Sequence, residues 1–293
     1  MTGPYADLTR PPLHAAALRR ALLVPGGLWT RLEVVEETGS TNADVATAAR
    51  AGAAEGLVVV AEQQTAGRGR AGRSWVCAPR AGLAVSVLLR PDAAQARWGW
   101  LPLLAGVALA DAVARLAELD VALKWPNDLL VTTGSAGTGD AVGGGADGAG
   151  KCAGILAETL PDVRGVVLGI GLNVTTRAAE LPPPRPGAAA ATSLELAGAI
   201  ATDRDPLLRA LLRGLAAWYG RWGAAGGDAG ACGLREAYLR ACGTVGREVR
   251  AVLPVGEELT GVATTVDTDG RLVIRTAAGQ SRALAAGDVT HLR

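Results

Sequence analysis

Residues 65–75 interleave three arginines with three glycines, and this run constrains the local fold more than any other stretch of the chain. Glycine weakens helices and strands and lets the backbone reach conformations that other residues avoid, so we expect a flexible loop. The guanidinium forks of Arg68, Arg70 and Arg73 fit phosphate and carboxylate oxygens. The run therefore predicts an anion-binding loop. Taken alone, the run is first interpreted as a solvated basic turn and second as a nucleic-acid patch.

The bulk composition narrows these alternatives. The chain has 293 residues, 49% of them hydrophobic, which suits one large domain and one small one. Phenylalanine is absent, so the core must be built from Leu, Val, Ala and Ile. The formal net charge is +1, whereas a dedicated nucleic-acid binder usually carries a clear basic excess. The arginines are therefore a local feature, and we predict no DNA partner.

Cysteine and histidine give no sign of a metal site. None of the four cysteines has CxxC spacing, and the only histidines, His14 and His291, lie near the ends of the chain. We therefore expect free thiols in a reducing compartment. No signal-peptide pattern is present, and the longest apolar stretch, around Trp98–Ala110, is interrupted by Pro102 and Gly106. These features predict a cytoplasmic protein with no membrane partner.

Hydrophobic periodicity indicates strands that alternate with helices. An amphipathic helix is expected within Leu13–Leu23, and a Pro-rich connector at Pro182–Pro186. The other expected helices are Asn42–Ala51, which one residue of Ser-Thr-Asn should cap, Pro102–Leu119, Pro206–Trp222 and Leu234–Ala241. The expected strands are Val34–Glu36, Gly56–Ala61, Leu83–Leu89, Val121–Trp125, Leu129–Val131, Cys152–Glu158 and Val166–Ile170.

Two segments differ in character from the rest. Residues 133–150 are dominated by Gly, Ala, Ser and Thr and predict a disordered insertion at a hairpin turn. From Gly243 onward the pattern changes to short strands and turns, with strands expected at Arg247–Leu253, Glu258–Val266 and Leu272–Thr276, which suits a small barrel. Asp269-Gly270 is a hairpin signal within it. We therefore predict an extension with one helix over residues 1–30, a main domain over 31–242 and a small C-terminal domain over 243–293.

Five motifs occur in a fixed order. Thr-Gly-Ser-Thr-Asn spans residues 38–42, and the glycine-arginine run follows it. Leu-Lys-Trp-Pro-Asn-Asp-Leu-Leu spans residues 123–130, Gly-Lys-Cys-Ala-Gly-Ile-Leu-Ala-Glu spans 150–158, and Leu-Gly-Ile-Gly-Leu-Asn-Val spans 168–174. This set resembles biotin protein ligase, over about Val34–Val174 by motif and more loosely to the C-terminus. The resemblance is to the monofunctional type that lacks an N-terminal DNA-binding domain.

The resemblance implies an α+β fold and an activity. The fold would be a mixed β-sheet with flanking helices, of the class II synthetase-like kind, followed by an SH3-like β-barrel. The activity would be ATP-dependent conversion of biotin to biotinyl-5'-AMP, then transfer of biotin to a lysine of the biotin carboxyl carrier domain of acyl-CoA carboxylases. ATP and Mg²⁺ would be required, and the protein would be a monomer or a weak homodimer. Lipoate protein ligase and a nucleic-acid-binding regulator remain as alternatives.

By the same resemblance, individual residues acquire expected roles. Lys151, Arg68 and Asp128 would be catalytic, with Asp128 also a candidate Mg²⁺ ligand. A lysine beside a Gly-rich loop is otherwise usually solvated. The expected biotin-binding residues are Ser40, Thr41, Asn42, Gln64, Gly67, Arg68, Lys151 and Gly154. The expected adenylate-binding residues are Arg68, Arg70, Arg73, Trp75, Lys124, Asn127 and Asn173.

Overall fold

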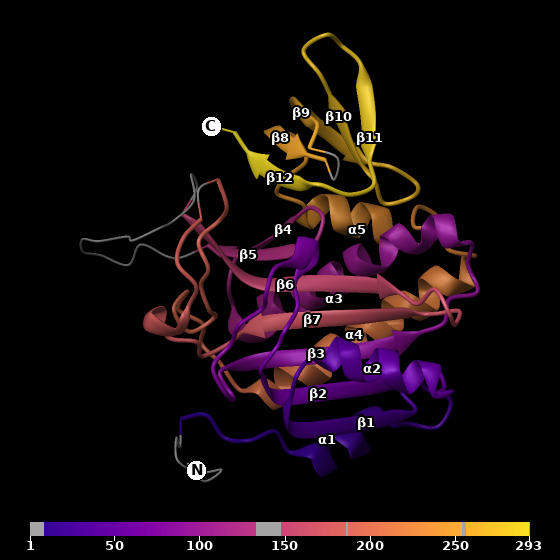
Figure 1. Ribbon diagram of the computed structural model, residues 1–293, viewed down its shortest axis with the longest axis vertical. Helices are drawn as coiled ribbons and strands as arrows, with labels where there is room; N and C mark the ends of the chain where they lie inside the picture. Colours follow the sequence, from indigo (N-terminus) through magenta and orange to yellow (C-terminus); the bar gives the residue numbers. More distant parts are fainter. Residues whose placement is uncertain (1–8, 133–147, 186, 254–255, 293) are drawn as a thin grey trace.

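The computed structural model describes residues 9–132, 148–185, 187–253 and 256–292. It contains a seven-stranded sheet with helices on both faces and a five-stranded sheet near the C-terminus (Figure 1). This confirms the expected mixed sheet with flanking helices and a small C-terminal β-domain. The exact division of the chain at residues 30/31 and 242/243 stays a prediction.

The large sheet has the strand order β1-β2-β3-β7-β6-β5-β4. Only β1 and β2 run parallel, and each remaining neighbouring pair is antiparallel. The last four strands along the chain bring the Lys-Trp-Pro-Asn-Asp and Gly-Lys-Cys-Ala-Gly motifs side by side. The strands are β1 (Arg31–Thr38), β2 (Leu57–Gln64), β3 (Gly82–Leu89), β4 (Val121–Lys124), β5 (Asp128–Thr132), β6 (Ala149–Thr159) and β7 (Val166–Asn173).

The helices divide between the two faces of this sheet. On one face, α3 (Trp100–Ala117) and α4 (Arg204–Ala224) pack against each other and bury the main core, with α1 (Ala15–Leu22) and α5 (Leu234–Ala241) beside them. On the other face, α2 (Thr41–Arg50) covers β2, β3 and β7 over a smaller apolar cluster. Because α2 shields only part of its face, the sheet beside its N-terminus is left open for a site.

The central helix α3 begins and ends two residues earlier than the sequence suggested. Counting a preceding 3₁₀ turn, the helical stretch runs over Gln95–Ala117, and by length and composition alone it is apolar enough to cross a membrane. Pro102 lies in its first turn, where proline is tolerated, and Gly106 faces Leu123, so neither interrupts it. In the most apolar part of this stretch, 72% is buried inside the protein, as in the core helix of a globular domain.

The small sheet has the order β11-β10-β9-β8-β12 and is antiparallel throughout. Its β9–β10 turn rests on the main domain, where the indole N–H of Trp100 donates to Thr268 O and that of Trp125 donates to Gly270 O. The strands β11 and β12 were not predicted. The bounds are β8 (Glu248–Val252), β9 (Glu258–Val266), β10 (Leu272–Arg275), β11 (Ser281–Leu284) and β12 (Asp288–His291).

Two further expectations concern chain segments and cysteines. The expected loop at 133–150 ends too late, because Ala149 and Gly150 already belong to β6 and pair with Thr132 and Val131. Residues 133–147 lie outside the described residues. All four cysteines are free, as the spacing predicted.

Candidate functional site

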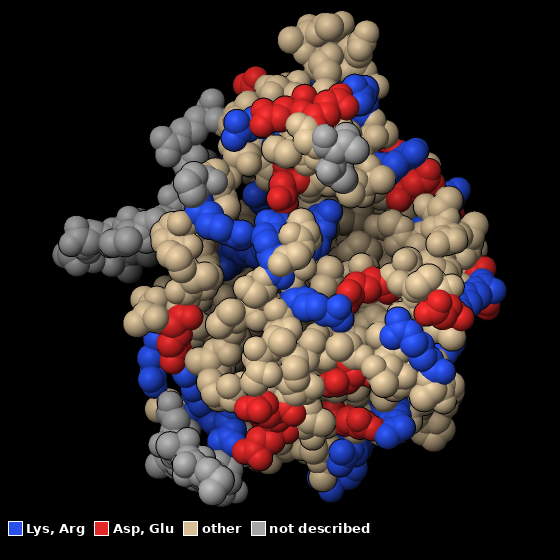
Figure 2. All heavy atoms as spheres, in the orientation of Figure 1, with Lys and Arg blue, Asp and Glu red and all other residues tan. Residues whose placement is uncertain are grey.

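A pocket opens on the α2 face of the large sheet, between the glycine-arginine loop and the Pro-rich segment. It encloses about 1080 Å³, counting the part open to solvent. Its floor is formed by the middle of β3, β6 and β7. Figure 2 shows Lys and Arg side chains gathered around a hollow in the centre of this face. The predicted residues that line it are Ser40, Thr41, Asn42, Gln64, Arg68, Arg70, Arg73, Trp75, Asn127, Lys151, Gly154 and Asn173.

Three predicted residues do not line this pocket. Lys124 and Asp128 are register partners across β4 and β5 and are not among the residues that line the pocket. Gly67 lies under the loop, where an added Cβ would come within 2.4 Å of Trp75 O and 2.9 Å of Gln64 Nε2. For Gly67, direct biotin contact therefore has less geometric support than a role in letting the loop pack closely on β2.

The polar end of the pocket is built at the start of α2. Ser40 occupies the N-cap position, but its side chain makes no capping hydrogen bond. Ser40 is thus the N-cap residue, as expected of one residue of Ser-Thr-Asn, but it caps the helix without a side-chain hydrogen bond. Gln64, at the end of β2, satisfies a backbone donor of the first turn, because its Oε1 accepts from Thr41 N–H at 2.8 Å and lies 3.0 Å from the Thr41 hydroxyl oxygen. Its amide is thereby fixed with the oxygen toward Thr41.

Trp75 lies flat on the floor of the pocket over two glycines. A Cβ on Gly171 would come within 2.4 Å of the indole ring, and one on Gly154 within 3.2 Å. The two glycines face each other across β6 and β7, so the sheet has a smooth patch there. The indole Nε1 of Trp75 is buried and has no hydrogen-bond partner among the described residues. A buried unpaired donor is costly, so this N–H is available to a ligand.

The cationic centre of the site is Lys151. Its Nζ lies 2.6 Å from Asp128 Oδ1 and 6.0 Å from the centre of the Trp75 ring. Burial lowers the pKa of the nearby Lys124 ammonium; Asp128 opposes this shift and Lys151 adds to it. The chain has only these two lysines, and both lie at this one position in the fold. An incoming anion would restore the charge balance that the two ammonium groups disturb.

The three loop arginines each contact a different part of the protein. Arg68 Nη1 lies 3.4 Å from Glu158 Oε1, and Arg70 Nη1 donates to Asn127 Oδ1 at 3.4 Å. Burial lowers the pKa of the Arg70 guanidinium. Arg73 Nη2 donates to Asp288 Oδ1, on β12 of the C-terminal sheet, at 2.8 Å. The loop is closed as a small hairpin by Gly69 N–H donating to Arg73 O at 2.6 Å. The carboxylates thus occupy positions where ligand phosphates would compete.

Asp288→Asn should raise the affinity for ATP, the nucleotide that the resemblance implies, by about two- to tenfold, because Arg73 then no longer has to leave a carboxylate before it meets a phosphate. The pair is partly exposed, with 35% and 57% of the two side chains accessible, so the fold should be little affected. Calorimetric titration with ATP measures the change. Arg282→Gln, which breaks an exposed ion pair on the same small sheet, should leave the affinity unchanged. An unaltered ATP affinity in Asp288→Asn would show that Asp288 does not compete with a ligand phosphate for Arg73.

Asn173 offers a second unsatisfied group. Its Nδ2 donates to Thr192 O at 3.0 Å, while its Oδ1 is buried with no partner among the described residues. The amide is therefore held in one orientation, with an acceptor left over for a ligand. The stretch after β7 also contributes, since residues 182–185 and Ala191 line the pocket. The sequence had indicated only a connector there.

The donor set for a metal ion is small. Within the described ranges, no three His, Cys, Asp or Glu side chains converge as a metal site. Asp128 is the nearest carboxylate, and it already pairs with Lys151. Mg²⁺ characteristically keeps several waters and is held by one or two carboxylates together with substrate phosphates. The residues present therefore fit only a magnesium ion that the phosphates of a nucleotide hold, and Asp128 as its protein ligand stays a prediction.

Sequence reasoning missed Ser86 and Glu158. Ser86 lies on β3 at the floor of the pocket, completely buried, and Glu158 lies on β6 between Arg68 and Asn42. A signal was available for the serine, because it is the only polar side chain in an apolar strand, and a buried hydroxyl needs a partner. Glu158 ends the Gly-Lys-Cys-Ala-Gly motif but was not given a role.

Comparison with known proteins places these features in context. Residues 36–174 match the Biotin/lipoate A/B protein ligase family, and residues 244–292 match the Biotin protein ligase C terminal domain. A biotin–[acetyl-CoA-carboxylase] ligase of Mycobacterium tuberculosis is 41% identical over 292 residues, which cover 98% of each chain. A ligase of the same name from Paracoccus denitrificans is 31% identical and covers 84% of this chain and 95% of its own.

Solved structures agree on the fold. The biotin protein ligase of Aquifex aeolicus, in complex with biotin and ATP, superposes with a TM-score of 0.69 at 24% identity and covers 90% of this chain and 100% of its own. The enzyme of Leishmania major, in complex with biotinyl-5-AMP, gives a TM-score of 0.55 at 22% identity and covers 88% and 98%. At these identities the likeness extends to the architecture alone.

Proposed function

This chain belongs to the biotin protein ligase family, and from that premise we propose that it activates biotin with ATP to biotinyl-5'-AMP and transfers biotin to a lysine of a carboxylase carrier domain. The single observation that carries the proposal is the composition of the pocket. One end presents hydroxyl and amide groups from Thr41 and Gln64, and the middle carries the Lys151 ammonium with the loop arginines around it.

The geometry suits the first chemical step. A carboxylate must approach the α-phosphate of ATP, and the repulsion between these anions has to be offset by fixed positive charge. Lys151 is anchored by Asp128 at one position on a rigid strand, and Arg70 and Arg73 line the same pocket. A bound Mg²⁺ would supply further positive charge to the phosphates. The glycine-arginine loop covers the site, and closing it would exclude water from a mixed anhydride, which hydrolyses.

The second step needs no nucleophile from the enzyme. The acyl-adenylate is itself the donor, and the attacking group is the amine of the acceptor lysine. No Ser or Cys side chain among the pocket-lining residues is paired with a His or carboxylate base in the described structure. We propose that Asp128 or a phosphate oxygen takes the amine proton, and that the acceptor is the biotin carboxyl carrier domain of an acyl-CoA carboxylase. We also propose that the protein acts in the cytoplasm, as a monomer or weak homodimer.

Biotin should stabilise the protein against heat and lipoate should not. A ligand at about 100 times its Kd stabilises the folded state by about 2.7 kcal/mol, which is a shift of several degrees. Lipoate has no cyclic urea to pair with the hydroxyl and amide groups at the start of α2, so leaving them unmatched should weaken it by about 10²-fold. Differential scanning calorimetry with each acid at equal concentration makes the comparison. A larger shift with lipoate would favour the lipoate ligase alternative.

A further inference from the structure

A chain of hydrogen bonds runs beneath the polar end of the pocket and ends at Glu158. Ser86 Oγ lies 2.7 Å from Thr41 Oγ1 and 2.6 Å from Asn42 Oδ1. Asn42 Nδ2 donates to Glu158 Oε2 at 2.6 Å. Ser86, Thr41 and Asn42 are each at most 5% exposed, so water does not substitute for these contacts. The four side chains form one connected path from the helix α2 to the strand β6.

The carboxylate at the end fixes the direction of the whole path. A carboxylate only accepts, so Asn42 must turn its amide nitrogen to Glu158 and its oxygen to Ser86. Ser86 has a single hydroxyl proton, which it donates in the hydrogen bond to Asn42 Oδ1. The 2.7 Å contact between Ser86 and Thr41 is then a hydrogen bond only if Thr41 donates. Gly169 leaves room for the Asn42 side chain, because a Cβ at residue 169 would lie 2.1 Å from Asn42 Oδ1.

The direction of these hydrogen bonds determines which atoms the pocket presents to a ligand. With its proton turned toward Ser86, the Thr41 hydroxyl presents a lone pair to the pocket. Gln64 Oε1, 3.0 Å away, presents another, because Thr41 N–H fixes that amide with its oxygen inward. The two hydroxyl protons cannot satisfy the three contacts that Thr41 and Ser86 make with each other, Gln64 and Asn42. The polar end of the pocket therefore has one hydrogen-bond donor too few, and a ligand N–H can supply it.

We propose that Glu158 is a positioning residue that sets the direction of this chain and so makes the pocket end select ligands with N–H donors, as in a cyclic urea. The inference rests on the proposed function, which identifies biotin as the ligand. Arg68 pairs with the other carboxylate oxygen at 3.4 Å, so the glycine-arginine loop and the polar end share one anchor. Asn42 then acts through Thr41 and is not itself required to touch biotin.

The first test reverses and restores the path. Asn42→Asp sets two carboxylates against each other and should weaken biotin binding by about tenfold or more, since a buried acceptor loses its donor. The double variant Asn42→Asp with Glu158→Gln restores the order, because the glutamine amide donates to Asp at 42, whose other oxygen accepts from Ser86. Its biotin Kd should return to within about threefold of the wild type. Titration calorimetry without ATP measures each Kd, and Asp162→Asn, an exposed carboxylate past the end of β6, is the control.

The second test measures selectivity, which a merely structural role would not change. The probe is a biotin analogue in which one ureido N–H is replaced by a ring oxygen. The wild type should prefer biotin over this cyclic carbamate by about 10- to 100-fold, because an oxygen lone pair would face an acceptor. Glu158→Gln alone lets the path run in either direction, so that Thr41 can donate to the carbamate. The preference should then fall at least about fivefold.

The outcomes separate the two claims. If the wild type does not bind biotin, the proposed function fails and the hydrogen-bond path loses its ligand. If the wild type binds biotin and forms the adenylate, but Glu158→Gln keeps the full preference, the path does not set selectivity. A double variant that stays as weak as Asn42→Asp also overturns the inference. Melting temperatures of all variants identify any that fail to fold, and the selectivity ratio is independent of the fraction folded.

Discussion

Lys151→Ala is expected to abolish biotin-dependent exchange of pyrophosphate into ATP. The ammonium lies on a rigid strand inside the pocket, 2.6 Å from Asp128, where two anions must meet. Removing one preorganised charge-stabilising group from such a site costs about 10²- to 10³-fold in rate. The Lys151 and Asp128 side chains keep 26% and 19% of their accessible surface, so losing this partly buried ion pair should cost less than the about 3–5 kcal/mol of a fully buried one. Labelled-pyrophosphate exchange and the melting temperature report the two effects separately.

Lys124→Ala is the matched control, because it removes the only other lysine in the chain. Lys124 does not line the pocket and acts on Lys151 through space, so its loss should reduce exchange at least about tenfold less. Full exchange activity in Lys151→Ala, or an equal loss in both variants, would contradict the assignment of Lys151 as the residue that meets the reacting anions.

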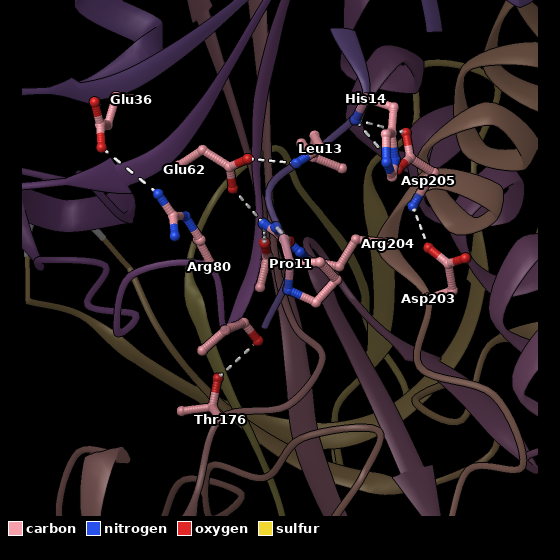
Figure 3. Close-up of polar contacts among 12 residues, drawn as sticks. Pro11, Leu13, His14, Glu36, Glu62, Arg80, Thr176, Asp203, Arg204 and Asp205 are labelled. Atoms are coloured by element: carbon pink, nitrogen blue, oxygen red, sulfur yellow. Dashed lines mark hydrogen bonds and ion pairs between the residues drawn. The ribbon is translucent and has the colours of Figure 1, made fainter. Parts of the chain in front are cut away.

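Glu62→Ala is expected to have the largest effect on stability. Glu62 is 8% exposed, and its carboxylate accepts from Arg204 Nη1 and from Leu13 N–H, both at 2.6 Å (Figure 3). Arg204 also donates to Pro11 O at 2.5 Å, so this pair ties the N-terminal segment to β2 and α4. Removing one partner of a buried ion pair leaves an uncompensated charge and costs about 3–5 kcal/mol.

Denaturant unfolding of Glu62→Ala measures that cost as a lower midpoint with an unchanged slope. Glu36→Ala is the control in the same region, since its carboxylate lies 3.5 Å from Arg80 and is 81% exposed. Because the Glu36 carboxylate is so exposed, its loss should cost only about 0–1 kcal/mol. Equal, small losses in both variants would show that the buried pair does not hold the N-terminal segment.

Local signals predicted much of this structure. The helix α5 has the predicted bounds, and β9 does too, because apolar periodicity and turn residues coincide at their ends. β11 was missed because Ser281 and Arg282 break the apolar alternation of an exposed strand. The strand β1 is longer at both ends than predicted, at Arg31–Thr38, since parallel pairing with β2 extends it over polar residues such as Arg31 and Glu37. Propensity alone gives no account of such long-range pairing.

The candidate site likewise combines residues that local motifs predicted with residues that only the fold brings together. Lys151, Trp75 and Asn173 lie in motifs, and the fold brings them into one pocket. The contact of Arg73 with Asp288 joins residues 215 positions apart and has no local signal. Glu158 was passed over because its role depends on the register that places β6 two strands from Ser86. A residue that acts through another side chain becomes visible only when hydrogen bonds can be counted in three dimensions.

Transfer of biotin to an acceptor protein tests the central claim most directly. The purified full chain would be incubated with biotin, ATP, Mg²⁺ and the biotin carboxyl carrier domain of an acyl-CoA carboxylase, and the acceptor examined by intact-mass and peptide mass spectrometry. The account predicts one biotin on one lysine of the acceptor, dependent on ATP and lost with Lys151→Ala. No adduct on an acceptor that a known biotin ligase modifies under the same conditions would contradict it.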